Sequence, residues 1–368
     1  MAAPLKTAAA GFVPRRVFEV SPSITRSYFL GHHAGALRSM HKILSNISLI
    51  LECRDSRVPL TSTNPLLEAA LAGRDRIVVY TKADLCAPAS ANRWLEKQQQ
   101  LLTEFHSAPR AGAGTTQVLF TDERNLRLMR QLMGAVKARA AAEESLTGVQ
   151  VLVVGMPNAG KSTLLNALRR VGMRLPKAAL TGAQPGVTRR MGMPVRVIPE
   201  DVPGGIDRGV FVIDTPGVFV PYVGDVESML KLALVGCVKD GLVPAETVAD
   251  YMLFHLNLRD PGLYAELCPP TNDVREFLDT VALRTGKLRR GGLPSQEQAA
   301  DWVLQQWRKG NLGRFGLDDV SEEGLRAWRA KGLTGDYQQL LSLSQAKKRE
   351  KDARKERYMA KRQAAEGA

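Results

Sequence analysis

The residue types and spacing of a phosphate-binding loop occur in Gly155-Met156-Pro157-Asn158-Ala159-Gly160-Lys161-Ser162. Gly160 has no side chain, so backbone N–H groups can wrap a phosphate, while Lys161 can supply a positive charge and Ser162 a hydroxyl for Mg²⁺. An apolar run precedes the loop and a helical pattern follows it, so the helix would point its positive end at the phosphates. This context favours a nucleotide-phosphate site over a plain glycine-rich turn. The expected contacts come from Asn158, Ala159, Gly160, Lys161, Ser162 and Thr163.

Two further segments have the residue types that complete a metal–phosphate site. Asp214-Thr215-Pro216-Gly217 follows the apolar run 210–213, where an Asp can hold Mg²⁺ through water and the Gly217 N–H can meet a γ-phosphate. Between the two motifs, Thr188 lies in a loop with Gly and Pro and could add a hydroxyl to Mg²⁺ while a triphosphate is bound. An ordinary turn threonine is the alternative. Ser162, Thr188 and Asp214 are therefore the expected Mg²⁺ ligands.

A third segment, Thr81-Lys82-Ala83-Asp84, has the pattern of a loop that reads guanine. The carboxylate of Asp84 can accept both the ring N–H and the exocyclic amine of guanine, which adenine does not offer in the same arrangement. The Lys82 stem can lie over the ring. Thr81 stands where Asn is usual and can still make one hydroxyl hydrogen bond. The second base-contacting loop, commonly Ser-Ala, would fall at Thr121-Asp122.

These segments stand in an unusual order, because the base-reading loop precedes the phosphate loop, whereas ordinary GTPases have it last. A permuted chain keeps the same pocket but joins the segment after Gly217 directly to the C-terminal part. Alternating strand and helix patterns predict a mostly parallel α/β sheet with both faces covered, and beyond residue 225 only helical periodicity remains. We therefore expect a basic leader (1–27), a circularly permuted P-loop GTPase domain (28–224), a smaller all-helical C-terminal domain (225–313) and a charged, basic tail (314–368).

The chain is strongly basic, with a formal net charge of +14. An excess of this size favours an anionic partner, either nucleic acid or a membrane surface, over simple solubility charge. The leader has several basic residues, one acid and no apolar core, which is typical of a mitochondrial or plastid transit peptide; a basic arm on a cytosolic protein is the alternative. The four cysteines form no Cys-x-x-Cys pair, so the sequence indicates neither a zinc site nor a disulfide framework.

In the order of its motifs, the chain resembles the circularly permuted GTPases of the YlqF/RbgA group. Similar segments are Tyr28-Phe29-Leu30-Gly31-His32, with Leu30 where the group has Pro, then Asp55-Ser56-Arg57-Val58-Pro59-Leu60, Thr285-Gly286-Lys287-Leu288, Gly291-Gly292 and Arg308-Lys309-Gly310-Asn311-Leu312-Gly313. With its basic leader, the chain looks most like the mitochondrial ribosome-associated branch. The resemblance implies a GTPase that binds GTP and GDP and docks on rRNA in its GTP state. It also implies assembly of the mitochondrial large ribosomal subunit in the matrix, with slow hydrolysis unless the ribosome activates it.

Two mechanistic expectations accompany this resemblance. Val218 follows Gly217, where many GTPases carry a Gln that orients the attacking water, and Val cannot do this. The resemblance nominates His32, in an N-terminal loop, as the catalytic residue that positions water; a structural loop histidine is the alternative. In GTPases of similar loop sequence the residue at Asn158 helps hold K⁺ near the phosphates, and a purely structural Asn is equally open.

Two other functions are compatible with the sequence. A peripheral scaffold on the matrix face of the inner membrane could use GTP as a structural ligand and the tail to bind anionic lipid, although the tail lacks a clear apolar stripe. A GTPase that modifies or delivers tRNA would need a modification site, and no cysteine or metal constellation supplies one. The default oligomeric state is a monomer.

Overall fold

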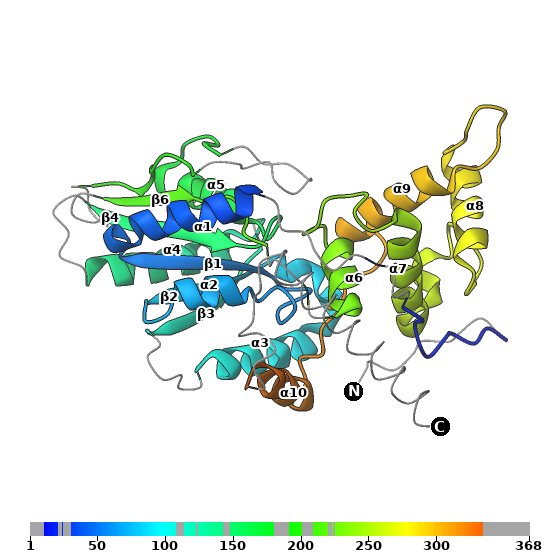
Figure 1. Cartoon of the computed structure of the whole chain (residues 1–368), viewed down its shortest axis with the longest axis horizontal. Coiled ribbons are helices and arrows are strands. Elements are labelled where there is room, and N and C mark those ends of the chain that lie inside the picture. Colours follow the sequence, from blue (N-terminus) through cyan, green and yellow to red (C-terminus); the bar gives the residue numbers. More distant parts are fainter. Residues whose placement is uncertain are drawn as a thin grey trace, which may run out of the picture.

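The computed structural model of the protein describes residues 11–20, 24, 31–107, 114–122, 124–142, 148–179, 191–200, 209–219, 223 and 225–333, without the side chains of 31–34, 89 and 331–333. Within these ranges the chain forms two parts that lie side by side along the long axis of the molecule (Figure 1). One part is a sheet covered by helices and the other is a bundle of helices.

A six-stranded sheet forms the centre of the first part, in the order β3-β2-β1-β4-β6-β5. Its strands are β1 (Leu49–Asp55), β2 (Arg76–Thr81), β3 (Thr116–Phe120), β4 (Val149–Gly155), β5 (Val195–Ile198) and β6 (Val210–Asp214). All neighbouring strands pair in parallel except β5, which pairs antiparallel with β6. The prediction of a mostly parallel α/β sheet is therefore confirmed.

Helices cover both faces of this sheet, because successive side chains of a strand point to opposite faces. Ile50 of β1 shares an apolar cluster with α1 and α2, whereas its neighbour Leu51 shares another with α4 and α5. The helices of this part are α1 (Gly31–Ile43), α2 (Pro65–Ala70), α3 (Asn92–Ser107), α4 (Leu126–Ala141) and α5 (Lys161–Met173), with short 3-10 turns η1 (Leu44–Asn46), η2 (Ala83–Leu85) and η3 (Ala89–Ala91). The carboxyl ends of β2, β4 and β6 lead directly into the loops that carry the sequence motifs.

Among the described residues of the second part, the regular elements are all helices, apart from an isolated β-bridge between Leu288 and Pro294. Its elements are α6 (Val226–Leu234), α7 (Ala245–Arg259), η4 (Pro261–Tyr264), α8 (Val274–Thr285) and α9 (Gln296–Arg308). Side chains all round α7 are buried between Val248 and Asn257, as expected for a helix at the centre of a bundle. Asp225 and Asp273 cap α6 and α8 by accepting backbone N–H hydrogen bonds. The predicted helical C-terminal domain is confirmed.

Part of the expected leader packs on this helical domain. Within residues 11–20, Arg15 pairs with Asp250 of α7 at 2.5 Å, and the Phe18 ring lies edge-on to Tyr251 with centroids 5.2 Å apart. Ile24 lies in the core of the same domain. The leader predicted at 1–27 therefore includes residues that contribute to the fold.

The chain returns to the sheet after α9, where the sequence led us to expect the start of a charged tail. Asp318 accepts hydrogen bonds from the backbone of Leu60 and Thr61, both at 2.8 Å. Helix α10 (Glu322–Leu333) then lies beside α3 (Figure 1), with Leu325 buried in a cluster that includes Phe105 of α3. The segment from Asp318 to Arg329 therefore packs on the GTPase domain, whereas Phe315 and Leu317 lie in the core of the helical domain. The predicted tail beyond residue 333 lies outside the described residues.

None of the helices formed by the described residues is long and apolar enough to cross a membrane. The four cysteines are free and buried. In the same part of the chain, no group of three or more His, Cys, Asp or Glu side chains is placed to hold a metal ion.

Candidate functional site

The phosphate loop joins β4 to α5 and needs both of its glycines. A Cβ at Gly155 would lie 2.3 Å from the carbonyl oxygen of Cys53, and Gly160 has a φ of +86°, which L side chains rarely adopt. Lys161 begins α5 with its side chain buried, and its Nζ donates to the carbonyl of Met156 at 2.7 Å. Burial lowers the pKa of Lys161. The ammonium thus lies inside the loop, where a phosphate oxygen can replace the Met156 carbonyl.

The side chains predicted to hold Mg²⁺ come together at the start of α5 and the end of β6. The Ser162 hydroxyl donates to Oδ2 of Asp214 at 2.5 Å. Among the described atoms, Oδ1 of Asp214 is buried without a hydrogen-bond partner, and burial raises the pKa of this carboxyl. A buried carboxylate oxygen of this kind needs a partner, and Mg²⁺ prefers oxygen ligands. Ser162 and Asp214 therefore fit Mg²⁺, whereas Thr188 lies outside the described residues.

The segment after Asp214 is held against β4 and the phosphate loop. Thr215 donates its hydroxyl to the carbonyl of Val153 at 2.7 Å, and the Val218 N–H donates to the carbonyl of Gly155 at 3.1 Å. A Cβ at Gly217 would lie 2.6 Å from the Cα of Pro157. Glycine is therefore needed at 217 because of this close approach, which sets the Gly217 backbone beside the phosphate loop.

The base-reading loop and the phosphate loop touch each other, although they are 78 residues apart in the chain. Thr81 donates its hydroxyl to the carbonyl of Ala159 at 2.8 Å, so Thr is able to join the two loops where Asn is usual. Lys82, with a left-handed backbone (φ 56°), donates Nζ to the carbonyl of Asn158 at 2.8 Å. These bonds hold the predicted base-reading loop and the phosphate loop against each other.

Asp84 lies half-buried next to Thr121-Asp122. The Ala83 N–H donates to the carbonyl of Thr121 at 3.1 Å, which places that dipeptide where a second base-contacting loop was expected. Burial raises the pKa of Asp84, and the like charge of Asp122 raises it further. A bound guanine would oppose both effects, because two N–H groups donated to the carboxylate stabilise its charged form.

His32 lies in the first turn of α1, and not in a loop as the sequence suggested; its side chain is outside the described part of the structure. Val218 is buried in the apolar cluster between the sheet and helices α1 and α2. The position after Gly217 therefore presents no polar group to a water molecule.

An ion-pair cluster next to the base loop was not identified from the sequence as part of the site. Asp55, at the end of β1, accepts hydrogen bonds at 2.8 Å from both Lys82 and Arg57. Burial opposes the charge of Asp55, but Arg57 and Lys82 together hold its pKa well below the usual range. The Arg57 guanidinium also lies 4.9 Å from the ring centroid of Trp307 in α9. The sequence had marked Asp55-Ser56-Arg57 only as a segment that resembles the family, and its position directly after a strand is the signal that could have pointed to this cluster.

The phosphate loop also contacts the helical domain. Asn158 has a left-handed backbone (φ 55°), and its Nδ2 donates to the carbonyl of Gly236 at 2.7 Å. Gly236 follows the last turn of α6, where Arg308 of α9 donates to the carbonyls of Ala233 and Leu234 at 2.9 and 3.0 Å. The loop that would hold the phosphates is thus bonded to the C-terminal end of α6.

A phosphate loop, an Asp placed where it could hold a metal ion and a guanine-type base loop at one edge of a mostly parallel sheet define a P-loop GTPase, here with the motifs in permuted order. A family model described as "50S ribosome-binding GTPase" matches residues 150–268. The chain is similar to Mitochondrial GTPase 1 of Schizosaccharomyces pombe, with 38% identity over 329 residues that cover 85% of this chain and 95% of that protein.

Two further relatives are similar over most of their length. Mitochondrial ribosome-associated GTPase 1 of Xenopus tropicalis is 31% identical over 325 residues, covering 83% of this chain and 98% of that protein. Ribosome biogenesis GTPase A of Priestia megaterium is 30% identical over 304 residues, which cover 81% of this chain and 98% of that protein. The chain therefore belongs to the circularly permuted YlqF/RbgA family of GTPases, which confirms the resemblance seen in the sequence.

Proposed function

We propose that this protein hydrolyses GTP as an assembly factor for the large subunit of the mitochondrial ribosome, in the matrix. It binds rRNA in its GTP state and leaves after hydrolysis. The names of the relatives support the ribosomal and mitochondrial parts of this proposal. The geometry supports the part that concerns the change between the GTP-bound state and the state after hydrolysis.

One structural observation carries the proposal. Val218 and Phe219 follow Gly217, and each is buried in a different apolar cluster. Val218 lies in the cluster between the sheet and helices α1 and α2, whereas Phe219 lies in the cluster of the helical domain. A shift of the Gly217 backbone on loss of the γ-phosphate would therefore act directly on the packing of the helical domain. This is the connection that a permuted chain order provides.

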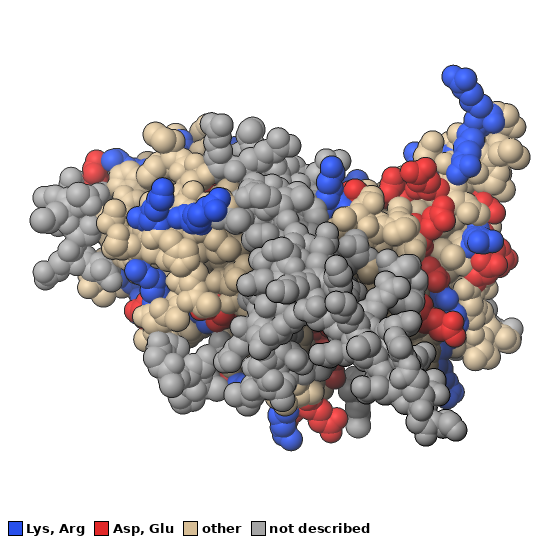
Figure 2. All heavy atoms as spheres, viewed as in Figure 1, with Lys and Arg blue, Asp and Glu red and all other residues tan. Residues whose placement is uncertain are grey.

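The RNA-contacting surface of the helical domain is proposed to be the loop between α8 and α9. Residues 225–313 contain twelve acidic and ten basic residues, so the domain as a whole is not basic. Lys287, Arg289 and Arg290, however, gather in that loop, beside the exposed side chains of Leu288 and Leu293. Figure 2 shows basic side chains at this tip and acidic ones over the body of the domain.

Hydrolysis is proposed to need help from the ribosome. Val218 cannot orient water, so His32, supplied by the first turn of α1, is proposed to do so in the ribosome-bound state. Mg²⁺ would be held by Ser162, Asp214 and Thr188. K⁺ would lie against Asn158, whose amide nitrogen is already bonded to Gly236, so that the amide oxygen is the atom to meet a cation.

The test compares GTP hydrolysis by the full chain with and without purified mitochondrial large subunits. We expect stimulation of about 100-fold or more, because completing a GTPase site from outside gives about 10³- to 10⁵-fold in other systems. Lys161→Ala should abolish hydrolysis in both conditions. If hydrolysis is indifferent to subunits and the protein sediments instead with salt-washed inner membranes, a membrane scaffold replaces this proposal.

A further inference from the structure

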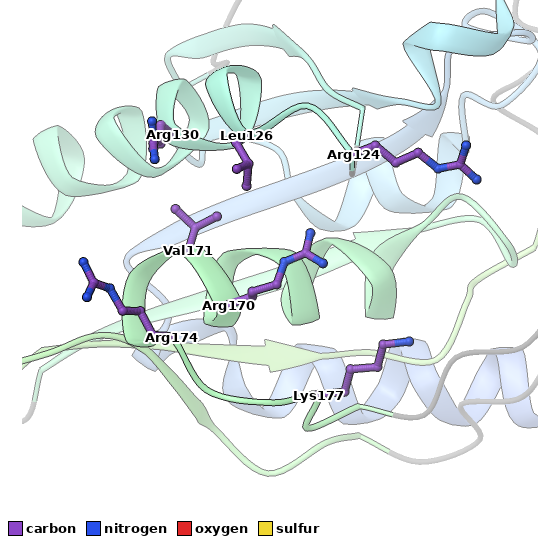
Figure 3. Close-up of a pocket in the computed structure, with 7 residues that line it drawn as sticks. All are labelled: Arg124, Leu126, Arg130, Arg170, Val171, Arg174 and Lys177. Atoms are coloured by element: carbon purple, nitrogen blue, oxygen red, sulfur yellow. The ribbon is translucent and has the colours of Figure 1, made fainter.

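An open groove of about 770 Å³ lies between α4 and α5 (Figure 3). Seven residues line it, and five of them are basic: Arg124, Arg130, Arg170, Arg174 and Lys177. The other two, Leu126 and Val171, are apolar, and none of the seven is acidic. The groove therefore presents cations around an apolar centre.

The two walls of the groove are formed by segments that have no acidic residue. Residues 124–142 and 161–179 together contain ten basic residues and no Asp or Glu. Charged surface residues that serve only to keep a protein soluble are normally mixed in sign, as they are in the helical domain. Solubility therefore does not account for this distribution. Like charges lining a concave surface reinforce one another's field and attract an anion of matching length.

The arrangement of the side chains fits a chain of phosphates better than a single phosphate. In Figure 3, Leu126 of α4 and Val171 of α5 point toward each other at the centre of the groove. Arg130 and Arg174 lie at one end, and Arg124 lies at the other. The side chain of Leu126 is 50% exposed, which leaves an apolar surface on which a ribose or base can rest.

The position of the groove relates it to the GTP site. Helix α5, which supplies Arg170, begins at the phosphate loop, and Arg124 is close enough to Asp84 to act on its carboxylate electrostatically. A strand of nucleic acid in the groove would thus lie along the GTPase domain itself. A membrane fits less well, because a lipid surface is flat and the cations here line a recess.

We propose that the α4–α5 groove binds the phosphodiester backbone of RNA, as a contact separate from the tip of the helical domain. The choice of RNA as the occupant rests on the proposed function. The five basic side chains are exposed, so they can be replaced without opening the core.

The test uses the full chain with two replacements in the groove, Arg130→Gln and Arg174→Asn. Arg174 has a φ of 57°, a backbone that Asn tolerates, so the double variant should fold normally. The matched control, Arg93→Gln with Lys97→Gln, removes the same charge from exposed positions on α3. Binding of fluorescein-labelled polyuridylate and of a mixed-sequence RNA duplex is measured by anisotropy from about 50 to 200 mM KCl.

We expect the groove variant to bind the RNA probes about tenfold more weakly at low salt. The slope of log affinity against log salt should be shallower by roughly 1.4, because each phosphate contact on a single strand contributes about 0.7. The control should stay close to wild type, and hydrolysis without subunits should be unchanged in both variants.

Two results would overturn the inference. The first is a groove variant that binds RNA as the control does; if wild type still sediments with large subunits, the proposed function stands and only the groove is refuted. The second is a groove variant that keeps its RNA affinity but loses binding to vesicles of phosphatidylcholine and phosphatidylserine, which would assign the groove to lipid.

Discussion

The side-chain amide of Asn158 donates to the carbonyl of Gly236 at 2.7 Å, and both residues have left-handed backbones, with φ values of 55° and 83°. Gly236 ends α6 in a tight C-terminal turn, in which the Cys237 N–H donates to the carbonyl of Leu232 at 2.9 Å. Because an amide is planar, this one bond also fixes the direction of the Asn158 oxygen. A single side chain therefore ties the phosphate loop to the helical domain and sets the oxygen proposed to face K⁺.

Replacing Asn158 with Ala should remove both of these roles. We expect the variant to lose any advantage that KCl gives over NaCl in GTP hydrolysis, because the amide oxygen proposed to hold K⁺ is gone. Steady-state hydrolysis in the two salts measures this.

The matched variant is Arg308→Gln. It weakens the hydrogen bonds that Arg308 donates to the carbonyls at the end of α6, and it does not change the phosphate loop. It should retain the potassium effect and reduce only the stimulation by subunits. An Asn158→Ala enzyme that still distinguishes K⁺ from Na⁺ would leave Asn158 with a structural role alone.

Gly217→Ala should disable the γ-phosphate response. The added Cβ would lie 2.6 Å from the Cα of Pro157, so the backbone at 217 must move away from the phosphate loop. We expect weaker binding of a non-hydrolysable GTP analogue with little change for GDP, and a loss of stability of about 1–3 kcal/mol. Titration with both nucleotides, together with urea unfolding, measures the two effects.

Gly134→Ala serves as the comparison for this variant. Gly134 lies in α4 with open space around the position of a Cβ, so Ala should stabilise the protein by about 0.5–1 kcal/mol and leave nucleotide binding unchanged. Equal analogue affinity in Gly217→Ala and wild type would show that this backbone does not contact the γ-phosphate.

Asp84→Asn should change which base the site accepts. An amide places an N–H donor where guanine presents its exocyclic amine, whereas xanthine has a carbonyl at that position. We expect a loss of GTP affinity of about 10⁴-fold and a gain for xanthosine triphosphate, as unpaired buried polar groups discriminate strongly. Competition between the two nucleotides tests this, with Glu96→Gln, which changes an exposed carboxylate on α3, as the control that should leave the preference for GTP unchanged.

The parts of this molecule that sequence predicted are those set by local patterns. The apolar runs that became β1, β2, β4 and β6 could only be buried strands between helices, and the loops after β2 and β4 meet because parallel strands bring their carboxyl ends to one edge. The contact of Thr81 with the Ala159 carbonyl follows from that arrangement.

The features that sequence did not predict depend on contacts between distant residues. Arg57 meets Trp307 across 250 positions of the chain. The segment around Arg57 resembles the family, but no local pattern indicates that these two residues meet. Val320 and Leu325 are separated by charged residues, so the segment looks like a tail until α3 supplies a surface to bury them. Asn158 was predicted to contact the phosphates, with a role in holding K⁺ or a structural role both open. Its bond to Gly236 was not predicted, because that bond requires the helical domain to be in place.

Acid should destabilise the helical domain through His255. Its half-buried ring packs against Tyr251, Phe254 and Phe315, and burial, assisted by Arg259 and Lys231, lowers its pKa to about 3. Arg259 lies 3.1 Å from Nδ1, so the neutral ring accepts there, while Nε2 is buried without a partner among the described atoms. A proton on His255 would therefore meet the Arg259 cation, and no carboxylate among the described residues compensates for it.

The direction of the pH effect follows from which state binds the proton. In the unfolded chain His255 takes up a proton as pH falls through about 6.5, whereas in the folded protein it stays neutral until about pH 3. The free energy of unfolding should thus fall by about 1.4 kcal/mol per pH unit from this group, or about 2 kcal/mol between pH 6.5 and 5. His255→Asn keeps an acceptor for Arg259 and removes the titration, so urea unfolding at pH 7 and pH 5 should show a smaller loss in the variant. An identical loss in both proteins would mean that other groups cause the acid sensitivity.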